Sequence, residues 1–184
     1  VVVRQHTSVV AVEARQAWCA AGTSLAFDLC VWCGGFAAPA LARGAGLPVD
    51  GQGRVLVDAT LRVPMFGNIV ATGDAAAVEI AGQPLRMGCV TALPMGAYAG
   101  DSVRRQLHGQ PIDEFRFTFM LRCISLGRAD GLVQFTQADD TPREAVWAGR
   151  RATYTKEAIC RMTYAVVRNE LRTGMRLYHW AQRN

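Results

Sequence analysis

The stretch "GRVLVDATLRVPMFGNIVATGDAAA", Gly53–Ala77, decides how this chain folds. An apolar strand-like run, Val55–Val63, is followed by the break "PMFGN" and by a second apolar run that ends in Thr-Gly-Asp before a series of alanines. A strand that only fills a core has no need of a carboxylate at its tip, because burying a charge is costly. The pattern therefore predicts a binding site in the loop that follows the second strand, at Gly73 and Asp74.

The residues before this stretch, 1–48, read as β-hairpin material. Val1–Val3 and Ser8–Glu13 alternate between apolar and polar side chains, and "LAFDLCVWC" (residues 25–33) is typical of a buried strand. Residues 49–112 hold the two strands of the opening stretch and a helix predicted from Ala92 to His108. This strand–loop–helix order is α/β in character.

The last region, residues 113–184, predicts an α+β extension. Phe115, Phe117 and Phe119 alternate like a strand, and "LVQFT" (residues 132–136) predicts a second strand. A long helix is expected from near Pro142 to the end of the chain, because proline is favoured in the first turn of helices.

Composition describes an ordinary globular protein. The chain has 184 residues, of which 51% are hydrophobic and 19% charged, so it can bury a core. No window reaches about 18 uncharged apolar residues, the length of a membrane-spanning helix. The sequence begins with valine inside a strand-like pattern and lacks the features of a signal peptide, so we expect a piece of a longer, cytoplasmic protein.

The six cysteines are predicted to be buried, reduced thiols: Cys19, Cys30, Cys33, Cys89, Cys123 and Cys160. The "CVWC" pair resembles a redox motif, but such motifs normally open a helix, whose dipole activates the thiol. Here the pair lies in a predicted strand, which would point the two side chains to opposite faces. Structural thiols are the favoured interpretation.

Charge is placed unevenly along the chain. The net charge is +5, but the residues from Arg143 onward carry nine Lys/Arg and three Glu, which is +6, so the rest is near −1. A basic tail of this kind is typical of nucleic-acid binding, of contact with a membrane surface, or of a solvated helix face.

Common catalytic and metal motifs are absent from the sequence. The three histidines lie far apart, and neither a G-x-S-x-G, an H-E-x-x-H nor a P-loop pattern occurs. The dinucleotide fingerprint G-x-G-x-x-G is also missing, since the approaches at Gly44 and Gly51 lack the third glycine. We therefore expect no metal and no catalytic side chain in this chain.

The stretch Gly53–Ala77 resembles the second flavin-binding motif of the two-dinucleotide-domain flavoproteins. These are the pyridine nucleotide-disulfide oxidoreductase superfamily and, more closely, its NADH dehydrogenase branch. The resemblance implies that Gly73 lets the backbone approach the ligand without a Cβ, and that Asp74 accepts a hydrogen bond from a ribityl hydroxyl of FAD.

Three other segments carry the same resemblance. "DLCVWCGGF" is similar to the strand end that closes the family's NAD(P)-binding domain, which implies that Gly34 and Gly35 lie near the nicotinamide cofactor. "MGCVTALPMGAYAG" is similar to the helix after the Gly-Asp loop, whose first turn, Val90, Thr91 and Ala92, would face the pyrimidine edge of the flavin. "CISLGRADGLVQF" resembles the C-terminal region of a subgroup of these dehydrogenases.

The resemblance implies a partial FAD/NAD(P)-binding, Rossmann-like α/β fold with a C-terminal α+β extension. Residues 1–48 would end the NAD(P)-binding domain, residues 49–112 would be the returning part of the FAD-binding domain, and residues 113–184 would form a strand pair and a basic helix. Both G-x-G-x-x-G turns of the family would lie upstream.

The implied activity is that of an FAD-dependent NAD(P)H dehydrogenase, with hydride passing from NAD(P)H to flavin N5 and on to an acceptor such as a quinone. The C-terminal helix places Ile159, Met162, Val166, Leu171, Met175 and Tyr178 near one face, with Trp180 suited to an interface. Peripheral attachment to the inner face of a membrane, or packing of this face onto the protein, would explain it. The alternative is a non-catalytic partner- or nucleic-acid-binding module that uses the basic helix, although no helix-turn-helix, zinc or aromatic-basic signature supports nucleic acid.

Overall fold

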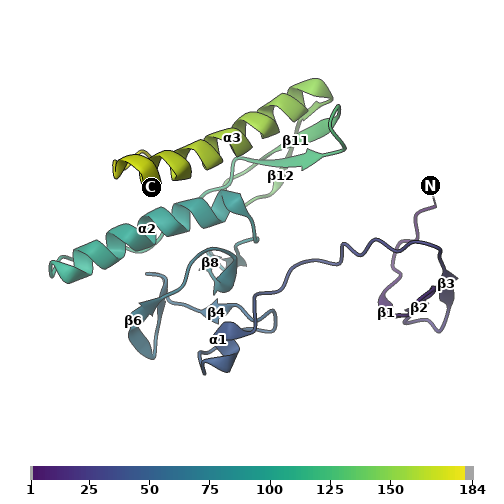
Figure 1. Ribbon diagram of the computed structural model, residues 1–184, viewed down its shortest axis with the longest axis horizontal. Coiled ribbons are helices and arrows are strands. Elements are labelled where there is room, and N and C mark those ends of the chain that lie inside the picture. Colours follow the sequence, from purple (N-terminus) through teal and green to yellow (C-terminus); the bar gives the residue numbers. More distant parts are fainter. Residues whose placement is uncertain (1, 181–184) are drawn as a thin grey trace. The chain divides into compact units, whose positions relative to one another are not determined.

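The computed structural model describes residues 2–180 and divides the chain into two compact units, one ending at Gly35 and one beginning at Phe36. The first unit is a three-stranded antiparallel sheet (Figure 1), with strands β1 (Val9–Val12), β2 (Gln16–Cys19) and β3 (Ser24–Ala26). The predicted strand Ser8–Glu13 is confirmed as β1. The strand expected at Val1–Val3 does not form, because Val2 and Val3 are exposed and unpaired; Val1 lies outside the described residues.

The strand predicted from "LAFDLCVWC" is wrong beyond its first two residues. β3 ends at Ala26, and residues 28–39 have no regular structure. Phe27 N–H donates to Arg15 O (3.0 Å), and the next backbone hydrogen bond along the chain is Ala38 N–H to Gln52 O (2.9 Å). A strand needs a partner for its backbone groups, and residues 28–37 have none.

The second unit begins with short elements around the opening stretch: α1 (Leu41–Gly44), β4 (Val55–Leu56), β5 (Arg62–Val63), β6 (Phe66–Val70), the 3₁₀ turn η1 (Gly73–Ala75), β7 (Ala76–Ala77), β8 (Glu79–Ile80) and β9 (Gln83–Pro84). β4 pairs with β7 in parallel, whereas β5–β6 and β8–β9 are antiparallel hairpins. These pairs hold the two predicted strands of the opening stretch close to each other.

The first of those strands is interrupted by a turn at Asp58. Its Oδ1 accepts the backbone N–H groups of Thr60 (2.8 Å) and Arg62 (3.1 Å), and Leu61 between them has φ +59°. Asp58 therefore diverts the backbone from the strand ladder, as aspartate commonly does in turns. The turn buries Leu61 completely in the core.

Helix α2 (Cys89–Leu107) confirms the predicted helix and extends it by three residues at its start. Its buried face packs into a core that includes Leu61, Met95 and Tyr98. The three alternating phenylalanines also enter this core: Phe115, Phe117 and Phe119. The strand predicted there does not form, because the backbone donates singly to separate loops, for example from Phe115 to Ala59 O (2.8 Å).

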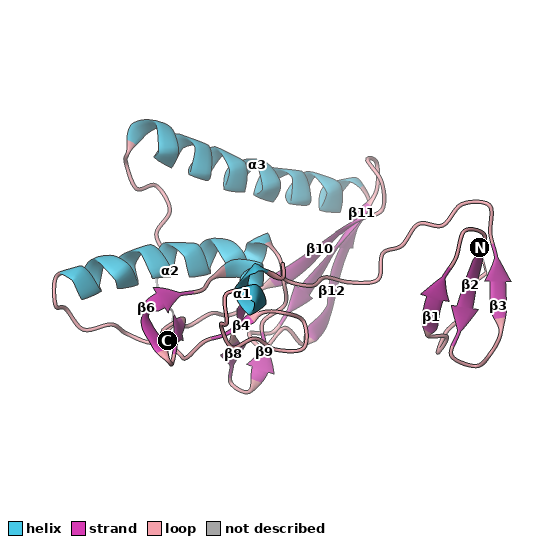
Figure 2. Ribbon diagram, turned by 60° about the horizontal axis from the view of Figure 1, so that its bottom comes forward, coloured by secondary structure: helices cyan, strands magenta, loops and turns pink. Residues whose placement is uncertain are grey.

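A three-stranded antiparallel sheet and a long helix follow (Figure 2): β10 (Leu121–Ser125), β11 (Gly131–Thr136), β12 (Pro142–Ala148) and α3 (Arg150–Thr173). β11 confirms the predicted strand "LVQFT". The helix start predicted at Pro142 is wrong, because Pro142 opens edge strand β12, where its missing N–H does no harm. Trp147 of β12 contacts Phe135 of β11 edge to face, with ring centroids 5.0 Å apart.

The segment after α3 folds back onto α2 and onto the core of the second unit. Glu170 Oε1 accepts the N–H groups of Leu177 (2.8 Å) and Tyr178 (2.7 Å), and Arg176 forms an ion pair with Asp101 on α2. Trp180 stacks on Phe117, with ring centroids 5.5 Å apart and planes at 23°. Trp180, expected at an interface, therefore contacts the chain's own core.

The prediction of a single apolar face on the C-terminal helix is also wrong. α3 ends at Thr173, where Gly174 adopts φ +66°, so the expected members Met175 and Tyr178 lie outside it. Ile159 and Val166 are half-buried, whereas Met162 and Leu171 are exposed, and the predicted residues do not form one face.

The predicted burial of the cysteines is mostly wrong. All six are free thiols, but only Cys19 is buried; Cys123 is half-buried, and the others are exposed: Cys30, Cys33, Cys89 and Cys160. Burial raises the pKa of the Cys123 thiol.

Candidate functional site

The Gly-Asp turn rests on the first turn of α2. Gly73 begins the 3₁₀ turn with φ +64°, a conformation that favours glycine. A Cβ at Gly73 would lie 3.4 Å from the Cβ of Ala92, so the backbone passes close to the helix. The strand end predicted to bind a ligand thus lies directly beside the helix start predicted to face the same ligand.

Asp74 ties the strand end to the helix start. Its Oδ1 accepts the backbone N–H of Gly88, the residue that caps α2, at 2.7 Å. Asp74 is exposed, and its Oδ2 has no hydrogen-bond partner among residues 2–180. One carboxylate oxygen therefore fixes the loop, and the other is available as an acceptor.

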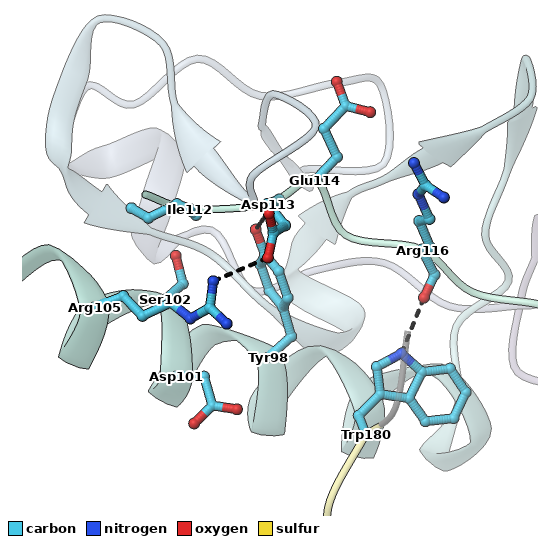
Figure 3. A pocket seen from close by; sticks show the side chains of 9 residues that line it. All are labelled: Tyr98, Asp101, Ser102, Arg105, Ile112, Asp113, Glu114, Arg116 and Trp180. Carbon is cyan, nitrogen blue, oxygen red and sulfur yellow. Dashed lines mark hydrogen bonds and ion pairs between the residues drawn. The ribbon is translucent and has the colours of Figure 1, made fainter. Parts of the chain in front are cut away.

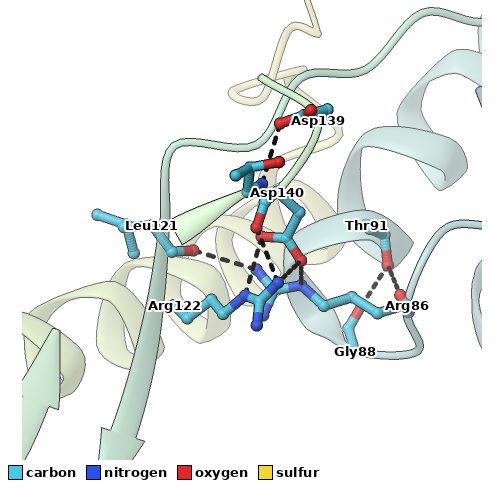
Figure 4. Close-up of polar contacts among 8 residues, drawn as sticks. Arg86, Gly88, Thr91, Leu121, Arg122, Asp139 and Asp140 are labelled. Carbon is cyan, nitrogen blue, oxygen red and sulfur yellow. Dashed lines mark hydrogen bonds and ion pairs between the residues drawn. The ribbon is translucent and has the colours of Figure 1, made fainter. Parts of the chain in front are cut away.

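At the start of α2, some hydrogen-bond donors are free and others already have acceptors. The first N–H groups of a helix have no acceptor within the helix, and they carry the positive end of its dipole. Here they belong to Cys89 and Val90, both exposed. The Thr91 side chain is fully buried, and its hydroxyl donates to Arg86 O or Gly88 O, each at 2.9 Å (Figure 4).

An ion-pair network, which the sequence did not reveal, anchors this helix start (Figure 4). Asp140 Oδ2 contacts Arg86 Nε (3.2 Å) and the Arg122 guanidinium (2.8 Å), and Arg86 also donates to Leu121 O (3.1 Å). Burial lowers the pKa of Arg86, and the Asp140 carboxylate partly opposes that shift. The loop before α2 is thereby fixed to β10 and to the loop before β12.

Gly34 and Gly35, the two other predicted site residues, belong to the first unit. Both are exposed, Gly35 has φ +105°, and the Trp32 ring lies where a Cβ on Gly34 would stand. The second unit thus brings together Gly73, Asp74, Val90, Thr91 and Ala92.

A cavity of about 570 Å³ lies at the other end of α2 (Figure 3). Two of its charged groups pair with each other, Arg105 and Asp113 at 2.9 Å, and the Tyr98 hydroxyl donates to Asp113 O at 2.5 Å. Burial raises the pKa of Tyr98. Because these groups hold the segment after α2 in place, we give the cavity a structural role.

Within the described part of the chain, no group of three His, Cys, Asp or Glu side chains could hold a metal ion. The same residues contain no helix that is long and apolar enough to cross a membrane.

Comparison with known proteins identifies the class. The family model described as "Pyridine nucleotide-disulphide oxidoreductase" matches residues 1–96, more than half of the chain, so the chain belongs to this family. The predicted family and the mixed α/β fold are thereby confirmed.

Comparison with individual proteins shows which members of the family this chain is similar to. NADH dehydrogenase-like proteins from two strains of Mycobacterium tuberculosis are 33% identical over 157 residues, which cover 85% of this chain and 38% of each relative. The sulfide:quinone oxidoreductase of Aquifex aeolicus superposes with a TM-score of 0.66 at 21% identity, covering 89% of this chain and 41% of that one. The chain thus spans about two fifths of the length of these proteins.

Proposed function

We propose that this chain is the C-terminal portion of an FAD-dependent NAD(P)H dehydrogenase. The observation that carries the proposal is the contact between the Gly73–Asp74 turn and the start of α2, which leaves one carboxylate oxygen and the first helical N–H groups available. An available acceptor beside a positive helix end suits a ligand that carries both hydroxyl groups and an electron-rich ring edge.

Each residue has a definite part in this proposal. Gly73 allows the backbone to approach FAD, and the free Oδ2 of Asp74 accepts a hydrogen bond from a ribityl hydroxyl. In the turn Val90–Ala92, the free N–H of Val90 and the positive end of the helix dipole would face the pyrimidine edge, while the N–H groups of Thr91 and Ala92 donate to Gly88 O and hold the turn in shape. Gly34 and Gly35 are proposed to serve the nicotinamide dinucleotide.

When bound, FAD would supply the redox chemistry. Its N5 atom can accept a hydride from NAD(P)H, and the electrons can then pass to an acceptor. The residues of this chain supply position and electrostatics, and none of them needs to act as an acid or a base. A quinone is the proposed acceptor, in keeping with the name of the Aquifex aeolicus protein.

The test is flavin retention by the full-length protein. Asp74→Ala should lower the ratio of bound flavin to protein, measured from flavin absorbance after gel filtration. Asp130→Ala is the matched control, because Asp130 Oδ1 also accepts a glycine N–H, that of Gly131 at 2.8 Å, away from the site. Equal flavin content in wild type and Asp74→Ala would contradict the assignment of Asp74 as a flavin-binding residue.

We propose a second, separate property, peripheral attachment of the basic helix to the inner, cytoplasmic face of a membrane. Exposed apolar side chains at i, i+3 and i+7 share one face of α3: Tyr164 (66% exposed), Val167 (42%) and Leu171 (84%). Exposed arginines such as Arg168 and Arg172 lie on the same helix. This combination favours binding to a membrane surface that contains anionic lipids.

Flotation with anionic and with zwitterionic vesicles tests this attachment. Arg172→Glu should weaken binding to anionic vesicles, whereas Arg104→Glu, the same charge change on α2, should not. Absence of binding to anionic vesicles would exclude attachment. A salt-dependent gel shift would instead support the nucleic-acid-binding module.

A further inference from the structure

The last residues of the first unit carry two exposed thiols three residues apart, Cys30 and Cys33. No backbone hydrogen bond involves residues 28–37, all of which the structure describes. The side chains around the thiols are also uncovered, with Val31 76% and Trp32 64% exposed. No backbone ladder holds this segment in one conformation, although the Trp32 ring lies against Gly34.

The other four cysteines are fixed by their elements. Cys19 is buried in β2, and Cys123 is paired with Val133 in the β10–β11 ladder. Cys89 and Cys160 are held by the backbones of α2 and α3. Cys30 and Cys33 are thus the pair that a purely local rearrangement can bring together.

The distance between the Cα atoms of Cys30 and Cys33 determines which rearrangement a disulfide would require. Three extended residues span roughly 10 Å, whereas the Cα atoms of a disulfide stand roughly 4.4–6.8 Å apart. Ring closure therefore requires a turn at Val31–Trp32. Such a turn breaks no hydrogen bond of the segment, and the adjoining Gly34 and Gly35 add conformational freedom.

We propose that Cys30 and Cys33 form an accessible dithiol site that a low-molecular-weight disulfide converts into an intrasegment disulfide. One thiol loses its proton, and its sulfur attacks the disulfide, which yields a mixed disulfide and releases one small thiolate. The second cysteine sulfur, also deprotonated, then attacks the mixed disulfide and releases the other small thiolate. Two protein thiols become one S–S bond, and the reagent is reduced to two thiols after its thiolates take up the two protons.

This inference is independent of flavin binding. Its structural consequence is a turn at Val31–Trp32, within the first unit, in the oxidised form. The ring encloses Trp32, whose emission should change on oxidation and return on reduction.

The experiment uses the whole chain and oxidised glutathione. Chymotryptic cleavage after Trp32 separates Cys30 from Cys33, so the two peptides should remain joined before reduction and separate after it, as read by mass spectrometry. Cys30→Ser and Cys33→Ser should each stop at a stable glutathione adduct. The double substitution Cys89→Ser and Cys160→Ser should leave ring formation unchanged.

Two results would overturn the proposal. One is stable glutathione adducts on both cysteines of the wild-type chain without joined peptides. The other is a lack of reaction at both positions under conditions that modify the exposed Cys89 or Cys160.

Discussion

The carboxylate of Asp74 accepts the backbone N–H of Gly88 at 2.7 Å and so connects the end of the Gly-Asp strand to the cap of α2. This bond explains how two segments separated by the β8–β9 hairpin come to share one site. It also gives Asp74 a structural role beside the proposed ligand role.

Asp74→Ala should therefore destabilise the second unit even without flavin. Loss of one exposed hydrogen bond to a charged acceptor predicts a decrease of about 1 kcal/mol in the free energy of unfolding, measured by urea denaturation with circular dichroism. Asp130→Ala should cost less, since the Asp130 carboxylate accepts the N–H of the next residue, Gly131, and connects no separate segments. An Asp74→Ala variant as stable as the wild type would contradict this role.

Gly73→Ala should be destabilising because of its backbone conformation. The residue has φ +64°, where a Cβ costs roughly 1 kcal/mol, whereas the new methyl group would meet the Cβ of Ala92 at 3.4 Å, an ordinary contact. Gly67→Ala is the control, because Gly67 has open space around it and no positive φ. The two variants should differ in urea midpoint, and equal midpoints would show that the Gly73 turn adapts freely.

The turns at Asp50 and Asp58 should make the second unit acid-sensitive. Burial raises the pKa of each carboxyl, but hydrogen bonds from Arg54 and Gln52 to Asp50, and from Thr60 and Arg62 to Asp58, outweigh it, so both pKa values lie below the usual 3.8. The stability that they contribute is complete above pH 3.8 and is lost as the pH falls through their folded-state values.

Urea unfolding at a series of pH values measures this effect. Asp58→Asn should flatten the decline of stability below pH 3.8, whereas Glu79→Gln, at an exposed carboxylate outside these turns, should leave the curve unchanged. A decline of the same steepness in Asp58→Asn would argue against the turn as its source.

Met95→Ala should be the most disruptive change in α2. Met95 is 2% exposed in the core, and truncation of a buried methionine costs about 2–5 kcal/mol. Leu107→Ala, in the same helix but 79% exposed, should change the unfolding free energy by no more than about 0.5 kcal/mol. Thermal melts of both variants provide the comparison, and comparable losses would mean that α2 does not pack as described.

Local chemistry made part of this structure predictable. Gly and Asp after an apolar run mark a turn wherever they occur, and α2 carries its periodic apolar face within its own sequence, so both could be predicted. The strand β12 could not, because "PREA" favours a helix start, and only the pairing with β11 and the contact of Trp147 with Phe135 make it a strand. The Arg86–Asp140 pair was missed for the same reason, since its partners are far apart in the chain.

The arrangement of β10, β11, β12 and α3 has a consequence for the order of folding. Each of these elements pairs or packs with a neighbour in the sequence, whereas β4 must find β7 across the whole β5–β6 hairpin and the Gly-Asp turn. Contacts between sequence neighbours form faster, because less loop entropy is lost before they are made. The C-terminal sheet and helix should thus collapse first and act as the nucleus on which the Gly-Asp turn later closes.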